Sequence, residues 1–252
     1  MKLNYVYGVF FFALTCTALD PVRESLEWGA TGAIGAGAYV LSVNGPFFDE
    51  PLIDGDTDKG LKDDTVPNEI LVYASSGAAL AIFLITPNND ERLLTRYSHG
   101  KGYIQALTVD CFLYGLIKDV VGSPRPCADA RYESGFPKRS IRDSFPSGHT
   151  ATAFTSATYL SLYIWNCLGD NRGSAEIISK SALSAALMCS AGWIGYTRID
   201  DNMHRTEDVI AGAALGTAVA AGVFAFQQNA LDSRGGPELT VIPDGFAILW
   251  RF

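Results

Sequence analysis

The chain has 252 residues and a formal net charge of −8, with 48% hydrophobic and 18% charged residues. This acidic balance excludes a nucleic-acid-binding protein, which would present a basic face to the phosphate backbone. The length fits a single domain, and no linker or internal repeat divides it.

The N-terminal residues predict an export signal. Lys2 is followed by an apolar run from Tyr5 to Leu14 and by small residues up to Ala18, so we expect residues 1–18 to be a signal peptide and residues 19–252 to form one exported domain, periplasmic or secreted. The alternative is an N-terminal membrane anchor, but the run is shorter than the roughly 20 apolar residues that a span needs.

Six long stretches with little or no charge follow, and they are mostly rich in Ala, Leu and Gly. Their length and composition predict helices that are buried on most sides. The stretches are residues 29–48, 70–86, 103–117, 150–169, 181–197 and 209–226. The predicted fold class is therefore all-α, a bundle of about six core helices.

Polar segments between these stretches, such as "NNDERLLTRYSHGKG" over residues 88–102, predict exposed turns. The helices are rich in small and hydroxylated residues, and Asp110 interrupts the third. On these grounds we expect a water-soluble exported bundle. The alternative is an integral membrane protein with its active site on the outer face, because small residues also favour helix packing inside membranes.

The C-terminal residues change character. In "ELTVIPDGFAILWRF", Pro243, Asp244 and Gly245 stand between two β-prone runs. This is the chemistry of a hairpin turn, so we expect a short C-terminal β-hairpin over residues 238–252 that covers the bundle.

Charged side chains gather at the ends of predicted helices, where a buried bundle can hold them only if they have partners. Lys118 and Arg125 follow the third helix, and Arg198 follows the fifth. Such cations donate hydrogen bonds to phosphate oxygens, so together they predict a site for a tetrahedral oxyanion. Ser147 and Gly148 precede the fourth helix, whose free N–H groups and dipole favour an anion, so we expect this turn to join the phosphate-binding site.

Two histidines stand beside these cations. His204 and Asp208 are four residues apart, so the carboxylate is expected to reach one ring nitrogen and leave the other as a nucleophile. His149 is the predicted general acid, which donates a proton to the leaving alcohol. Each element has an ordinary alternative: Ser147 could simply cap its helix, and an acid four residues after a histidine often only supports a helix.

No metal or other cofactor is predicted. The acidic segment "DGDTDKGLKDD" alternates Asp54, Asp56 and Asp58 as a calcium loop does, but Lys59 stands where such a loop requires glycine and Thr65 where it requires the closing glutamate. We interpret the segment as a solvated acidic loop. The chain has three histidines, which makes a zinc site an unfavoured hypothesis.

The three segments together resemble the signature of the type 2 phosphatidic acid phosphatase (PAP2) and vanadium haloperoxidase superfamily, K-x6-R-P, P-S-G-H and S-R-x5-H-x3-D. The motifs lie within residues 118–208, and Thr197 replaces the usual serine. The matching positions are Lys118, Arg125, Pro126, Pro146, Ser147, Gly148, His149, Arg198, His204 and Asp208.

The resemblance implies a metal-independent phosphatase that hydrolyses phosphate monoesters or pyrophosphates, either of a lipid such as phosphatidic acid or of a soluble ester. It also implies that His204 forms a phosphohistidine intermediate and that His149 protonates the leaving group. One alternative is a vanadium-dependent haloperoxidase, although those enzymes are typically much longer chains. The second alternative is a non-catalytic anion-binding membrane protein. It is disfavoured because both histidines and Asp208 are intact.

Overall fold

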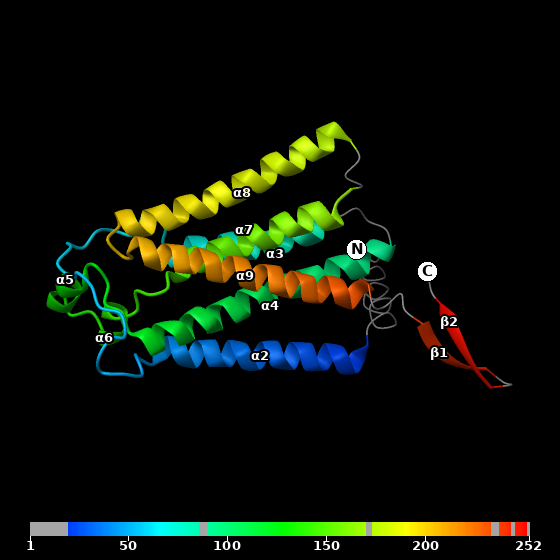
Figure 1. Ribbon diagram of the computed structural model, residues 1–252, viewed down its shortest axis with the longest axis horizontal. Helices are drawn as coiled ribbons and strands as arrows, with labels where there is room; N and C mark the ends of the chain where they lie inside the picture. Colours follow the sequence, from blue (N-terminus) through cyan, green and yellow to red (C-terminus); the bar gives the residue numbers. More distant parts are fainter. Residues whose placement is uncertain (1–19, 86–89, 170–172, 233–236, 243–244, 251–252) are drawn as a thin grey trace, which may run out of the picture.

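The computed structural model describes residues 20–85, 90–169, 173–232, 237–242 and 245–250. The predicted signal peptide, residues 1–18, lies outside this part. Six long helices lie side by side, and the short helices α5 (Ala128–Glu133) and α6 (Lys138–Ile141) lie at one end of them (Figure 1). The long helices are α2 (Pro21–Val43), α3 (Asn68–Ile85), α4 (Asp90–Val121), α7 (Gly148–Cys167), α8 (Ser174–Asp200) and α9 (Thr206–Asp232).

Helix α2 begins and ends where its flanking residues dictate. The Asp20 carboxylate accepts hydrogen bonds from the backbone N–H groups of Val22 (3.0 Å) and Arg23 (3.3 Å), and proline occupies the first helical position. Both features favour a helix N-terminus. The helix ends at Val43, before Gly45 and Pro46, so the predicted range of 29–48 starts and ends too late.

Residues 90–102, predicted as an exposed turn, form the first part of α4, so this prediction was wrong. The charges of the segment find partners on α2: Lys101 Nζ lies 2.8 Å from Glu24 Oε1 and 2.6 Å from Glu27 Oε2, and the lysine side chain is 1% exposed. His99 is fully buried and stacks on Phe224 with ring centroids 4.6 Å apart. Paired charges can be buried inside a bundle, whereas unpaired ones cannot.

Helix α7 packs between its neighbours, and its contact with α9 is the most extensive. Gly216 of α9 lies against the backbone of Ala151 and Thr155, and a Cβ atom at Gly216 would collide with these atoms. Gly212 lies in the same way against the Ser147 carbonyl, 2.5 Å from the position of an added Cβ. These two glycines therefore set how closely the start of α9 approaches the start of α7.

Substituting Gly216 by alanine is expected to lower the free energy of unfolding by about 1–3 kcal/mol or more, because the added methyl group meets backbone rather than a side chain that can move. Gly222→Ala is the matched control, since nothing lies within 4 Å of a Cβ there on the same helix. Thermal unfolding of the two variants checks this. Equal midpoints would contradict the close-contact role of Gly216.

The predicted all-α core fits the structure, in which the described residues contain six long helices and two short ones. The short helices α5 and α6 were not predicted, because they lie in a polar segment without apolar periodicity. The predicted C-terminal hairpin was wrong as a part of this fold. From residue 20 to residue 232 the described chain contains helices and loops and no strand, so the predicted hairpin forms no part of the bundle. Strands β1 (Pro237–Ile242) and β2 (Gly245–Trp250) pair with each other beyond the end of the helices (Figure 1), and the predicted turn residues 243–244 lie outside the described chain. An isolated pair of strands has too little apolar surface to pack as a layer.

The interior of the bundle holds many polar and charged side chains beside two apolar clusters. Among the described residues, more buried side chains are polar or charged than apolar. Large apolar side chains of α3 face outward, including Tyr73 (74% exposed) and Leu84 (73% exposed). In the same part of the chain, α8 and α9 are long and apolar enough to cross a membrane. Exposed apolar patches mark a surface that contacts a membrane or a protein partner.

Candidate active site

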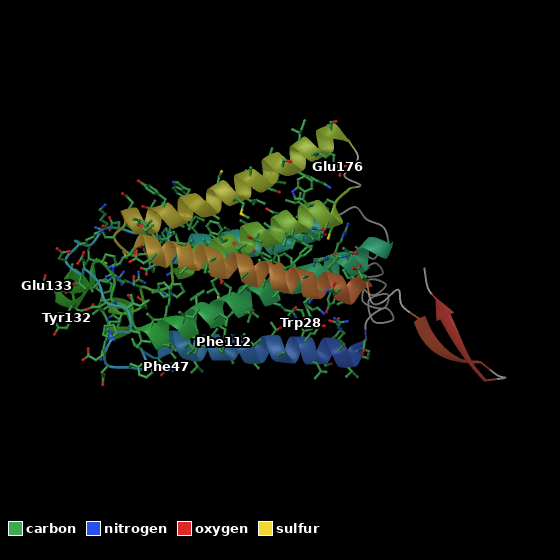
Figure 2. The ribbon with its side chains drawn as sticks, in the orientation of Figure 1. Trp28, Phe47, Phe112, Tyr132, Glu133 and Glu176 are labelled. Atoms are coloured by element: carbon green, nitrogen blue, oxygen red, sulfur yellow. The ribbon has the colours of Figure 1, made fainter. Side chains whose placement is uncertain are left out.

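A cavity of about 420 Å³ lies at the end of the bundle where α5 and α6 are found. Figure 2 shows the side chains there: Tyr132 and Glu133 of α5 mark this end, and Glu176 of α8 marks the opposite one. The structure brings most of the predicted site residues to the walls of this cavity. They are Lys118, Arg125, Gly148, His149, Arg198 and His204. Ser147 and Asp208 lie behind the walls.

The N-terminus of α7 carries Gly148 and His149 to the cavity. Ser147 is the N-cap: its Oγ accepts hydrogen bonds from Thr150 N (3.5 Å) and from Thr150 Oγ1 (3.0 Å), and the side chain is fully buried. Its backbone N–H donates to the Asp208 carbonyl at 2.9 Å. The Ser147 hydroxyl is therefore placed as a helix cap, and it is the backbone of this turn that borders the cavity.

Arg125 and Lys118 share one carboxylate. Arg125 Nε donates to Asp143 Oδ1 at 2.6 Å, while Lys118 Nζ donates to the Asp143 carbonyl and lies 3.9 Å from Oδ2. Burial alone would raise the pKa of Asp143, but the charges of Arg125 and Lys118 outweigh it and hold this pKa well below its usual range. The ionised Asp143 thus fixes the two cations and offsets part of their charge.

Arg198 is 1% exposed and lies between two acids. Its Nη2 donates to Asp201 Oδ2 at 2.6 Å, and its Nη1 donates to Asp64 Oδ1 at 3.3 Å. The Asp201 side chain is 3% exposed, whereas that of Asp64 is 39% exposed and belongs to the loop before α3. Asp201 is therefore the structural partner of Arg198, and Asp64 is the partner that a bound anion could replace.

His204 lines the cavity, and Asp208 lies beside it behind the wall. His204 Nδ1 is 3.6 Å from Asp208 Oδ2, longer than a hydrogen bond, and it has no other hydrogen-bond partner among the described residues. Asp208 Oδ2 accepts from Ser144 Oγ (2.6 Å) and from Arg205 N (2.8 Å), which fix the carboxylate. Burial lowers the pKa of His204, with Asp208 opposing and the charge of Arg125 adding to the shift, so the free ring is neutral.

His149 contacts the loop that precedes α3. Its Nε2 lies 3.1 Å from the Val66 carbonyl oxygen. Since a carbonyl can only accept, this contact assigns the hydrogen to Nε2 in the neutral ring and leaves Nδ1 without one. The segment from Asp64 to Val66 therefore touches both Arg198 and His149.

Four charged residues of the cavity wall were missed by the sequence reasoning: Asp64, Arg131, Arg139 and Asp143. Arg131 donates to the Ser140 carbonyl (3.1 Å) and lies over the Phe136 ring, 4.8 Å from its centroid. Arg139 contacts Asp119 Oδ1 at 3.0 Å. The available signal was the basic run between the first and second motifs, residues 131–142, which carries arginines and a lysine close to both.

A second cavity, of about 490 Å³, opens between α3, α4 and α7. Its walls are mainly apolar, with Val72, Ala79, Ile104 and Leu107 among them. We call it the apolar groove. It shares Asn68, Leu71, Tyr114 and Thr152 with the cavity of the histidines, so the two spaces adjoin.

One protein-family model matches the part of the chain that contains these site residues. The model of the PAP2 superfamily matches residues 101–232, a range that contains all three motifs. A PA-phosphatase related-family protein of Dictyostelium discoideum is 26% identical over 180 residues, covering 68% of this chain and 64% of that protein. Lipid phosphate phosphatase 1 of Arabidopsis thaliana is 40% identical over 87 residues, 34% of this chain and 25% of the relative.

A further relative is the probable diacylglycerol pyrophosphate phosphatase 1 of Schizosaccharomyces pombe, 29% identical over 143 residues that cover 49% of this chain and 51% of that protein. The chain thus spans less than two thirds of the length of each of these curated relatives. No solved structure matches it.

Proposed function

Because the chain belongs to the PAP2 superfamily, we propose that it is a phosphatase that acts on lipid phosphates through a phosphohistidine intermediate. The observation that carries the proposal is the meeting of three cations and two histidines, from three separate segments of the chain, at one cavity. Lys118, Arg125 and Arg198 supply positive charge for phosphate oxygens, and the free N–H groups at the start of α7 add donors.

The reaction proceeds in two steps in this proposal. The unprotonated Nε2 of His204 attacks phosphorus, the bond between phosphorus and the ester oxygen breaks, and protonated His149 gives its proton to the leaving alcohol. Water then attacks the phosphohistidine, its proton passes to His149, and the phosphorus–nitrogen bond breaks to release inorganic phosphate. Asp208 stabilises the positive charge that His204 gains, and the 3.6 Å contact shortens as the Nδ1 proton strengthens it.

The apolar groove supports a lipid as the leaving group. It adjoins the phosphate-binding cavity and opens between helices whose outer surfaces are apolar, so a hydrocarbon chain can extend from the phosphate along it. The outward apolar side chains and the two helices of membrane-spanning length also favour an integral membrane protein over the soluble exported protein that we expected. The relatives named as lipid phosphate phosphatases point to the same substrate class.

The test is release of inorganic phosphate by the purified full-length chain in detergent with EDTA present. Phosphatidate in mixed micelles and p-nitrophenyl phosphate are compared. We expect metal-independent hydrolysis and a higher kcat/KM for the lipid. If neither substrate releases phosphate, the protein is an anion-binding protein. If it oxidises bromide when vanadate is added, it is a haloperoxidase. Release from p-nitrophenyl phosphate alone would overturn the lipid proposal. Extraction of the protein from membranes by carbonate would contradict the integral placement.

Substituting Asp64 by alanine is expected to tighten inhibition by inorganic phosphate or vanadate roughly two- to fivefold, because the exposed carboxylate competes with the anion for Arg198. Asp63→Ala is the matched control, since Asp63 is a neighbouring exposed acid that does not line the cavity. Inhibition constants for the two variants check this. A weaker inhibition in Asp64→Ala would mean that Asp64 serves to position Arg198 instead.

A further inference from the structure

One of the three polar side chains at the junction of the two cavities is buried. Four residues line both spaces, namely Asn68, Leu71, Tyr114 and Thr152. Leu71 has no polar atom, Asn68 is exposed at the start of α3, and the Tyr114 hydroxyl contacts Cys111 Sγ at 3.5 Å. Thr152 is 9% exposed and is therefore the buried hydrogen-bonding group between the phosphate-binding cavity and the apolar groove.

Thr152 lies beside the path of the leaving group. It follows His149 by three residues in α7, so both side chains share a face and are separated by about 4.5 Å along the helix axis. A lipid whose ester oxygen receives a proton from His149 and whose chain enters the groove must pass Thr152 directly after its phosphate. The atoms next to Thr152 are then those on the carbon adjacent to the ester carbon.

Asp110 determines the direction of the Thr152 hydrogen bond. Thr152 Oγ1 donates to Asp110 Oδ2 at 3.3 Å, and Asp110 of α4 is completely buried. A carboxylate in such a place needs donors, and a hydroxyl has one hydrogen to give. With its hydrogen given to Asp110, the Thr152 hydroxyl has only lone pairs left, so it can act only as an acceptor for a ligand.

We propose that Thr152, oriented by Asp110, is a specificity-determining residue that selects lipid phosphates with a hydroxyl or an amide N–H on the carbon adjacent to the ester carbon. The inference rests on the proposed lipid phosphatase function and names the class of lipid within it. Lysophosphatidate has such a donor. Phosphatidate and isoprenoid phosphates do not, and they are hydrolysed without this hydrogen bond.

The experiment compares kcat/KM for lysophosphatidate and for its 2-deoxy analogue, with the same acyl chain and in the same mixed micelles. The protein is expected to favour lysophosphatidate about three- to tenfold, the value of one neutral hydrogen bond. Thr152→Val removes this preference and Thr152→Ser retains it. Asp110→Asn reduces the preference for a lipid with an amide N–H at that carbon, because the Asn amide can donate to Thr152 and turn its hydroxyl hydrogen toward the substrate. A substrate hydroxyl can accept that hydrogen, so the preference for lysophosphatidate is kept.

Each outcome separates the two proposals. Equal kcat/KM for both lipids in the unaltered protein, or an undiminished preference in Thr152→Val, overturns the specificity assignment while the lipid phosphatase function stands. Release from neither lipid overturns the lipid function and this inference with it. The ratio of the kcat/KM values for the two lipids is measured within each variant, so a general loss of activity in Thr152→Val does not obscure the result. Asp110→Asn gives a second measurement.

Discussion

Replacing His204 by alanine will lower kcat for phosphate release by at least about a thousandfold, because the substitution removes the atom that forms the bond to phosphorus. The effect should be the same for phosphatidate and for p-nitrophenyl phosphate, since both must pass through the same covalent intermediate. His204→Asn should be equally inactive, because the amide nitrogen is not nucleophilic. Steady-state rates with the purified variants measure this directly.

His99→Gln is the control for the His204 variants. His99 is also a buried histidine, but it lies among Tyr159, Phe224 and Gln228, outside the cavity. We expect this variant to keep the kcat of the parent wherever it folds, as judged by helical content and elution volume. Turnover by His204→Ala within about tenfold of the parent would exclude His204 as the nucleophile.

Replacing His149 by alanine will slow the release of a lipid alcohol by about 10²- to 10⁴-fold, because a strongly basic alkoxide cannot leave without a proton. p-Nitrophenolate is a weak base and needs no such help. We therefore expect His149→Ala to retain a rapid burst of p-nitrophenol, followed by slow turnover because the water that attacks the intermediate has lost its base. Stopped-flow absorbance at high enzyme concentration resolves the two phases.

His149→Gln tests whether the contact with the Val66 carbonyl contributes, because a glutamine amide can still donate to it. It should behave like His149→Ala if proton transfer is the essential role. The general-acid assignment fails if His149→Ala loses the p-nitrophenol burst as completely as it loses release of the lipid alcohol.

The sequence was sufficient to find the six long helices, since each contains a run with little or no charge that is too long for a strand. Their ends were harder to predict, because caps such as Asp20 and Pro21 are short local signals outside the apolar runs. The start of α4 was missed for a different reason. Lys101 makes the segment look solvated, and only the distant Glu24 and Glu27 allow it to be buried.

The site was predictable to the extent that motif spacing constrains helix ends. Lys118, Arg125, His149, Arg198 and His204 stand at such ends, and they meet at one cavity. Asp64 and Arg131 belong to no motif, and tertiary packing alone brings them to the wall. The capping bond of Ser147 competes with the phosphate-binding role that the motif suggested, and the sequence offers no means to choose between them.

Trapping the covalent intermediate tests the central proposal most directly. The protein is mixed with radiolabelled p-nitrophenyl phosphate, whose leaving group needs no proton from His149, quenched in alkali within milliseconds, digested and mapped by mass spectrometry. We predict an alkali-stable, acid-labile phosphate on the peptide that contains His204, in larger amount in His149→Ala than in the parent and none in His204→Ala. Label on another residue, or full turnover with no labelled peptide at any quench time, would contradict nucleophilic attack by His204.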